Sequence, residues 1–205
     1  MLFRSANVKY IEADLTDAAR IQAVAHECEA ELPKVDVLFN VAGSDVIRKS
    51  FEYTDNEAWS TMIARNLSSA FWCSKAFLPL MKKAGGGAIV HHGSIDGFLG
   101  NPSIAGYSAG KGGLIPLTHV MAHDLAKYNI RVNCVSTGGI RAKPEPDTQY
   151  DHARIRVTPA ARLGLPNDVA PAVFFLASEG AGYISGANLV IDGGRTATTH
   201  GCYGD

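Results

Sequence analysis

The sequence is poor in cysteine, and the few it has are scattered. Four cysteines occur among 205 residues, with no CxxC pair and no metal-binding spacing. This excludes a zinc ribbon and argues against a small disulfide scaffold. We therefore expect reduced thiols in or near the core, which suits a cytoplasmic protein. They are Cys28, Cys73, Cys134 and Cys202.

A large excess of one charge and long apolar runs are also lacking. The 19 Lys and Arg nearly balance the 20 Asp and Glu, so the clustered positive charge that nucleic-acid binding needs is absent. No run reaches the ~18 apolar residues of a membrane span, and Met1–Arg4 is too short for a signal peptide. With 46% hydrophobic residues, the sequence predicts one domain, residues 1–205, with a sizeable core and neither a nucleic-acid nor a membrane partner.

Apolar runs with the periods of strands and helices alternate along the chain. We expect strands at Val8–Asp14, Val35–Asn40, Ile89–Ser94, Arg131–Val135 and Leu189–Gly194. Helices are expected at Ala18–Glu31, from Asp55 to about Met81, from Tyr107 to Tyr128 and from Pro166 onward. The polar, proline-containing stretch Lys143–Pro159 is expected to be a loop or lid. This alternation predicts an α/β fold with a parallel sheet flanked by helices.

Tyr107 and Lys111 are four residues apart in an expected helix, so both side chains lie on one face. A cation within ~4–6 Å favours the phenolate and lowers the pKa of a tyrosine by about 1–3 units. Tyr107 is thereby a candidate acid/base for a substrate oxygen. Alone, this spacing is equally typical of a solvated helix face. Further along the helix, Gly112, Gly113 and Pro116 predict a kink or a close approach of other elements.

Other polar residues supply the context for this pair. Ser94 ends an expected strand 13 residues before Tyr107, and Asn66 lies inside a long expected helix, where its propensity is poor. Asn40 and Gly43 follow a hydrophobic strand, and Asn133 lies in a later one. In order and spacing, the Asn–Ser–Tyr–Lys set resembles the catalytic tetrad of the short-chain dehydrogenase/reductase family, over about Val8 to Gly194.

The resemblance implies a Rossmann-like three-layer sandwich and an NAD- or NADP-dependent oxidoreductase that interconverts a carbonyl and a secondary alcohol. It implies that Ser94 binds the reacting oxygen, Tyr107 exchanges its proton, Lys111 lowers the Tyr107 pKa and holds the ribose, and Asn66 holds a relay water. Cofactor contacts are implied for Asp14, Leu15, Asn40, Ala42, Gly43, Tyr107, Lys111, Gly138 and Ile140. From the residues alone, Asp14 is equally a turn or cap residue and Gly43 a tight turn.

The sequence departs from the family pattern in two regions. No glycine-rich turn precedes Asp14, so the first β-α-β unit and its pyrophosphate cradle are missing, and the chain is expected to be an N-terminally truncated form or one with a late start. On the nicotinamide side, Thr137-Gly138 replaces the family's Pro-Gly, Ala142 stands at the usual Thr, and His91 and His92 are unusual.

Two other functions are consistent with the sequence. A catalytically silent homologue would keep the helices that, by resemblance, form homodimers or homotetramers, here Asn56–Met81 and Tyr107–Tyr128. A metal hydrolase would use His119 and His123, which form HxxxH, but Val120 stands where HExxH enzymes carry the general-base Glu and no third ligand is placed. Two histidines on a helix surface are the simpler interpretation.

Overall fold

The computed structural model describes residues 8–43, 46–142 and 146–197. The strands are β1 (Val37–Asn40), β2 (Gly87–Ser94), β3 (Ile130–Thr137) and β4 (Asn188–Ile191). The α-helices are α1 (Ala18–Glu31), α2 (Asn56–Ile63), α3 (Ser69–Lys83), α4 (Ala105–Leu125), α5 (Gln149–Arg156) and α6 (Pro166–Ala177). Shorter helical turns are η1 (Phe51–Tyr53), η2 (Ala64–Ser68), η3 (Ile95–Gly97), η4 (Ala126–Tyr128) and η5 (Glu179–Ala181).

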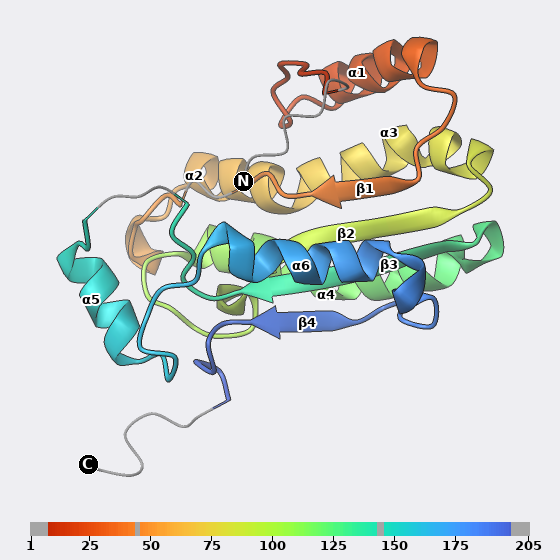
Figure 1. Ribbon diagram of the computed structural model, residues 1–205. Helices are drawn as coiled ribbons and strands as arrows, with labels where there is room; N and C mark the ends of the chain where they lie inside the picture. The colour runs from red at the N-terminus through yellow and green to blue at the C-terminus, as the bar shows by residue number, and fades with distance from the viewer. Residues whose placement is uncertain (1–7, 44–45, 143–145, 198–205) are drawn as a thin grey trace.

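The four strands form one parallel sheet in the order β1-β2-β3-β4 (Figure 1). Parallel pairing requires a crossover after each strand, and helices supply these connections. The register aligns Asn40 with His91, and Ser94 with Thr137. The carboxyl ends of the strands therefore meet at one edge of the sheet, on the left of Figure 1, where α5 also lies.

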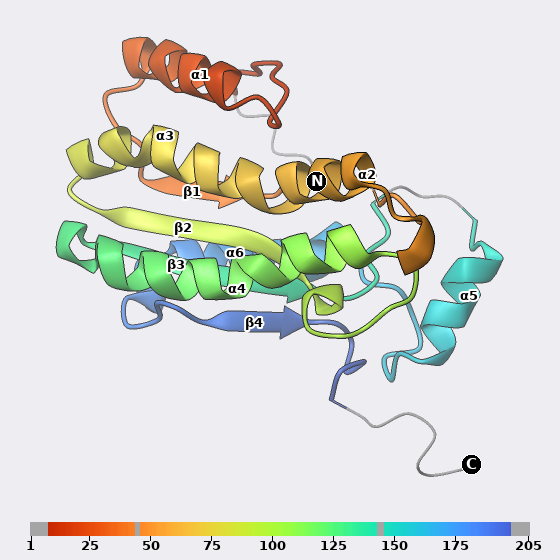
Figure 2. The same ribbon diagram turned by 180° about the vertical axis from the view of Figure 1, so that it is seen from behind.

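Helices cover both faces of the sheet, as the two opposite views show (Figures 1 and 2). On one face, Met81 of α3 packs with Ile89 and Val132. On the other, Leu176 of α6 packs against Val90 and Val135. Neighbouring strand residues point to opposite faces, so β2 and β3 are buried on both sides and read as continuous apolar runs. The predicted α/β three-layer architecture is confirmed.

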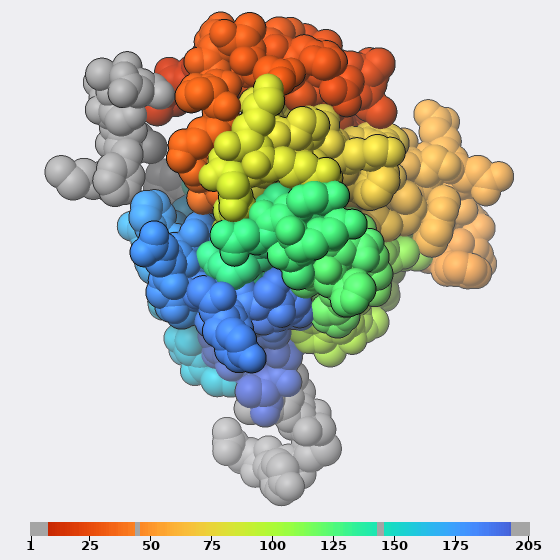
Figure 3. Space-filling view, turned by 90° about the vertical axis from the view of Figure 1, so that its right-hand side faces the viewer, coloured from red at the N-terminus to blue at the C-terminus, as the bar shows by residue number. Residues whose placement is uncertain are grey.

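Helix α1 packs on α3 through Ile21, Ala25 and Ala76. Figure 3, which faces the right-hand side of Figure 1, shows the connections stacked in chain order, from α1 in red through yellow and green to blue. This is the end where the connections enter the strands. The carboxyl ends lie on the opposite side of the molecule.

Two helix starts agree with local signals in the sequence, at Asp17 for α1 and at Pro166 for α6. Asp17 caps α1 by accepting hydrogen bonds from the backbone N–H groups of Ala19 and Arg20, at 2.8 and 3.1 Å. Pro166 occupies the first turn of α6, as expected. The glycines of α4 allow close packing: a Cβ at Gly112 would lie 2.7 Å from the carbonyl oxygen of Gly97. The helix runs through Pro116 to Leu125.

Two sequence predictions are wrong. Residues 8–14 form no strand; Arg20 donates to the Glu12 carbonyl at 3.0 Å, which holds the segment beside α1 instead of at a sheet edge. A strand needs a hydrogen-bonding neighbour, and this segment pairs with none of the described strands. The segment expected to be a loop between Lys143 and Pro159 contains α5, whose start is fixed by a capping box between Thr148 and Asp151.

The remaining composition-based expectations concern thiols and membrane spans. Cys28, Cys73 and Cys134 are free thiols, and Cys202 lies outside the described residues. Among the described helices, none is long and apolar enough to cross a membrane.

Candidate functional site

The predicted catalytic side chains come from three elements. Ser94 is the last residue of β2, where the sheet edge opens. Tyr107 and Lys111 lie in the first turns of α4, which packs against η2 and thereby against Asn66. Ser94, Asn66 and Lys111 are all buried, and Tyr107 is partly buried.

The side chains of Ser94 and Tyr107 lie close enough to interact, and the Ser94 hydroxyl acts to lower the pKa of the phenol. The Ser94 hydroxyl accepts a hydrogen bond from the backbone N–H of Asp96 at 3.1 Å. The structure thus places two hydroxyl oxygens side by side at the carboxyl end of β2.

The pKa of Tyr107 is raised, which corrects the sequence-based expectation that a neighbouring cation would lower it. Burial is the largest cause, and the Ser94 hydroxyl and the field of Arg154 only partly oppose it. Desolvation disfavours the charged phenolate. In this structure the phenol of Tyr107 is therefore a proton donor at neutral pH.

Lys111 is only 3% exposed. Its Nζ donates a hydrogen bond to the carbonyl oxygen of His92 at 2.7 Å. Burial lowers its pKa to about 8, because a buried ammonium loses its hydration. The ammonium is therefore buried near the end of β2, where a backbone carbonyl accepts its hydrogen bond.

Asn66 lies in η2, a π-helical turn between α2 and α3. The long helix expected from the sequence is thus interrupted at the residue singled out, and π-turns of this kind are frequent at functional sites. The Asn66 Nδ2 donates to the Met62 carbonyl at 3.0 Å, while its buried Oδ1 has no hydrogen-bond partner. A Cβ at Gly43, whose φ is +109°, would lie 2.9 Å from that oxygen.

Four of the predicted cofactor contacts line one hollow of about 330 Å³ next to β1. Asp14, Leu15, Ala42 and Gly43 surround it with Ala13, Thr16 and Arg65. The carboxylate of Asp14 is fixed by the backbone N–H and the hydroxyl of Thr16, both at 2.8 Å, and these bonds lower its pKa. Its carboxylate is thus held ionised at this hollow.

Asn40, Gly138 and Ile140 lie elsewhere. The Asn40 side chain is turned away from this hollow, donating to Ser74 Oγ at 3.0 Å and contacting His91 Nδ1 at 3.2 Å. Gly138 lines a separate cavity with Ser94, and Ile140 lines a third beyond it.

A contact between His92 and Thr137 was not predicted. The sequence marked both residues as departures from the family pattern, and the structure shows that they are partners, with His92 Nε2 and Thr137 Oγ1 3.1 Å apart. The ring therefore links the ends of β2 and β3, and burial lowers its pKa to about 4, so it is neutral.

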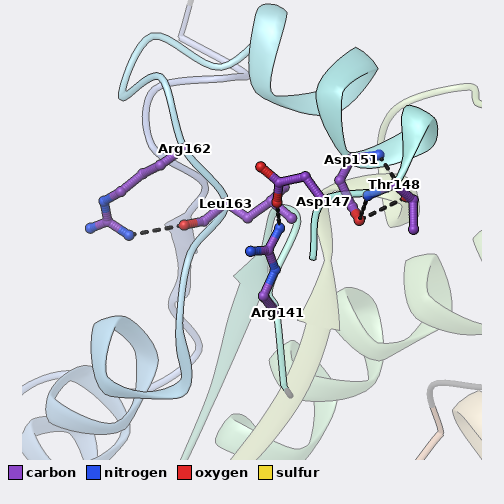
Figure 4. A network of polar contacts seen from close by, with 6 residues as sticks. All are labelled: Arg141, Asp147, Thr148, Asp151, Arg162 and Leu163. Carbon is purple, nitrogen blue, oxygen red and sulfur yellow. Dashed lines mark hydrogen bonds and ion pairs between the residues drawn. The ribbon is translucent and has the colours of Figure 1, made fainter. Parts of the chain in front are cut away.

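The segment that follows β3 is held by polar contacts (Figure 4). Arg141 pairs with Asp147, and Thr148 exchanges bonds with Asp151 at the start of α5. Arg162 donates to the Leu163 carbonyl at 3.0 Å. These contacts fix α5 beside the carboxyl edge of the sheet, where side chains of the helix reach the cavity that contains Ser94.

The structure gives the HxxxH pair no further ligands. His119 and His123 are exposed, and within residues 8–43, 46–142 and 146–197 no group of three or more His, Cys, Asp or Glu side chains could hold a metal ion.

Comparison with known proteins gives consistent matches. A family model described as enoyl-(acyl carrier protein) reductase matches residues 2–196. Galactitol 2-dehydrogenase (L-tagatose-forming) of Cereibacter sphaeroides is 39% identical over 197 residues, 91% of this chain and 75% of the relative. The 3-oxoacyl-(acyl-carrier-protein) reductase FabG of Escherichia coli (strain K12) is 37% identical over 194 residues, 94% of this chain and 79% of the relative.

Among solved structures, a gluconate 5-dehydrogenase from Burkholderia cenocepacia J2315 in complex with NADP and tartrate matches with a TM-score of 0.85 and 29% identity. The match covers 91% of this chain and 74% of that one.

Proposed function

Because this chain belongs to the short-chain dehydrogenase/reductase family, we propose that it interconverts a carbonyl and a secondary alcohol with NAD or NADP, using Tyr107 as acid/base. The observation that carries this proposal is the proximity of the Ser94 hydroxyl to the Tyr107 phenol at the carboxyl end of β2, with Lys111 one helical turn further along α4. In open parallel sheets, ligands bind outside the carboxyl ends of the strands.

Each residue of the set has a role that its contacts support. Ser94 donates to the oxygen of the bound substrate, and Tyr107 gives its proton to that oxygen during reduction and takes one back during oxidation. The raised pKa of Tyr107 favours the protonated phenol, and hence the reductive direction at neutral pH. Two hydroxyls that act on one oxygen stabilise the charge it gains in the transition state.

Lys111 and Asn66 would support this pair. The Lys111 ammonium keeps two donors beyond its bond to His92, and these suit the hydroxyls of a ribose. The unpartnered Oδ1 of Asn66 is an acceptor that suits an ordered water, the relay role implied by the family. Both residues would act by positioning, because neither gives its proton directly to the substrate.

The hollow at Asp14 and the pair Tyr107 and Lys111 offer groups that fit the two ends of a dinucleotide. Asp14 offers a carboxylate for the amino group of adenine, beside the apolar wall of Leu15 and Ala42. Tyr107 and Lys111 offer donors for the ribose at the other end. No glycine-rich strand-turn-helix occurs in the part of the chain that the structure describes, so those residues supply no pyrophosphate cradle. When bound, the nicotinamide supplies or accepts the hydride.

A cofactor titration tests this proposal. Purified full chain is titrated with NADPH and, separately, with NADH, and binding is followed through the fluorescence of the reduced nicotinamide. We expect saturable binding of at least one form, weakened by Lys111→Met, with the exposed Lys127→Met as matched control. Saturable binding together with carbonyl-dependent oxidation supports the enzyme; absence of binding for both forms contradicts it.

A catalytically silent subunit of a homo-oligomer is the second candidate function. It is favoured by an apolar hollow between α3 and α4, lined in part by Phe71, Leu78, Met121 and Leu125. Phe71 is 43% exposed, and Val120 of α4 is 58% exposed. Sedimentation of the full chain discriminates: a stable dimer that binds neither nicotinamide form favours the silent subunit.

A further inference from the structure

A cavity of about 330 Å³ opens directly beside Ser94. Its walls come from the end of β2, the loop after β3, and α5. The lining residues used below are Arg48, Ser94, Asp96, Gly139, Tyr150 and Arg154. Because Ser94 lines this cavity and lies beside Tyr107, this cavity is where the substrate of the proposed reaction would extend away from its reacting carbon.

Two of the lining arginines are arranged around one aromatic ring. Arg48 Nη2 donates to the Tyr150 hydroxyl at 2.9 Å, with its guanidinium carbon 4.9 Å from the ring centroid. The guanidinium carbon of Arg154 lies 5.3 Å from the same centroid. Cation–π contacts orient a guanidinium without neutralising it. Tyr150 therefore holds two full positive charges at the wall of the cavity.

Arg154 also lies against the loop that follows β3. A Cβ at Gly139 would be 2.7 Å from its guanidinium carbon, so the guanidinium packs directly on the backbone of this loop. The field of Arg154 reaches the phenol of Tyr107. One guanidinium thus lies near both the cavity and the proposed proton donor.

The charges that line the cavity do not balance. Arg195 is a third lining arginine and donates to the Val157 carbonyl at 3.2 Å. Among the lining residues, the one carboxylate is Asp96, which accepts a bond from Asn101. Asp151 also lies within the field of Arg154, but its carboxylate is engaged by Thr148 at the start of α5. Arg48 and Arg154 alone set two guanidinium groups against one lining carboxylate, so the cavity favours an anion.

We propose that the substrate carries an anionic group, a carboxylate or a phosphate, which Arg154 and Arg48 bind while its carbonyl or alcohol carbon lies at Ser94 and Tyr107. This rests on the proposed function and adds a substrate class to it. The planar fork of a guanidinium matches the paired oxygens of either anion. Charge, rather than the shape of an apolar pocket, then selects the substrate.

Matched pairs of charged and neutral probes test the proposal. L-tartrate is compared with its uncharged diamide, and glycerol 3-phosphate with glycerol, by titration calorimetry on the full chain with and without saturating NADP. We expect at least one anion to bind about tenfold or more tightly than its neutral partner, the margin of one charge-assisted contact. Whether tartrate or the phosphate ester shows this margin identifies the anion.

Variants on α5 provide the control. Arg154→Gln should weaken the anion about tenfold and leave its neutral partner unchanged, and Arg48→Gln should act in the same direction. Arg156→Gln changes an exposed arginine on the same helix that does not line the cavity, and should have no effect. Thermal melting verifies that each variant is folded.

The outcomes separate this proposal from the proposed function. Equal affinity within both pairs, no binding of either anion, or an Arg154→Gln variant that behaves like Arg156→Gln would overturn the anion site. The same samples are titrated with NADP and NAD. Anion binding without cofactor binding supports the anion site and contradicts the oxidoreductase function. Cofactor binding without discrimination between anion and neutral partner supports the oxidoreductase function and contradicts the anion site.

Discussion

Ionisable side chains on the two sides of the loop after β3 have very different environments. At the end of β2, the Tyr107 phenol and the Lys111 amine are withdrawn from water. Burial raises the pKa of Tyr107 and lowers that of Lys111, so the neutral form of each is favoured. On the far side of the loop, Arg162 makes two parallel bonds to Asp168 at 2.7 and 2.8 Å, and this pairing lowers the pKa of Asp168 to about 2.

The difference distinguishes groups that can transfer protons from groups that only stabilise the fold. A paired, solvated charge stays ionised at every ordinary pH and exchanges no protons, so the Arg162–Asp168 pair can only hold the start of α6 in place. Burial makes the charged form of an incompletely paired group costly, so Tyr107 stays protonated and can act as a proton donor, while the pKa of Lys111 falls to about 8. The three changes below should therefore act on activity, on pH dependence and on stability, in descending order of size.

Tyr107→Phe should have the largest effect. Removing the phenol oxygen removes the proton donor, and general acid/base groups contribute about 10²- to 10⁴-fold to rate. We expect kcat/KM for carbonyl reduction to fall by that factor, measured from consumption of the reduced nicotinamide, with little change in Tm. Tyr128→Phe, on a more solvated tyrosine near the end of α4, is the control. Retained turnover in Tyr107→Phe would remove the role assigned to the phenol.

Lys111→Met should change how stability depends on pH. The unfolded lysine titrates near pH ~10.4 and the folded one at about 8, so between these values the unfolded chain binds more protons. The free energy of unfolding of the wild type should therefore rise with pH across this window, relative to the variant, by about 3 kcal/mol. Urea unfolding of both proteins at several pH values measures this difference. A difference that is constant with pH would show that Lys111 is not desolvated.

Arg162→Gln should have the smallest effect. The pair is exposed, and surface ion pairs contribute little and are screened by salt. We expect a slight fall in Tm that shrinks in concentrated NaCl, with unchanged cofactor binding, measured by thermal melting and by the titration described above. A loss of binding in this variant would contradict the separation drawn here.

Features with a local cause could be predicted from the sequence. Asp17 and Pro166 mark helix starts because capping and the fixed φ of proline act within a few residues. The buried strands β2 and β3 were evident because each forms a continuous apolar run. Ser94 and Tyr107 could be grouped because their spacing is typical of the family, and their shared catalytic role stays a prediction.

Features that depend on contacts between distant segments could not be predicted from the sequence. Residues 8–14 have the composition of a strand, but composition does not provide a pairing partner. The raised pKa of Tyr107 depends on how deeply α4 packs, which helical spacing alone does not fix. The arrangement of Arg48 and Arg154 on Tyr150 brings together residues about a hundred positions apart. The polar composition that suggested a loop concealed α5.

The π-helical turn at Asn66 has a consequence for how the protein can vary. One extra residue in a helical turn can in principle migrate along the helix and carry its side chains to new positions. Here Gly43 and Gly110 both pack against Asn66, and a Cβ at either glycine would lie 2.9 Å from an atom of the Asn66 side chain. This packing fixes the position of the π-helical turn. A methyl group added at either glycine would therefore displace the Asn66 side chain, although both glycines are distant from Asn66 in sequence.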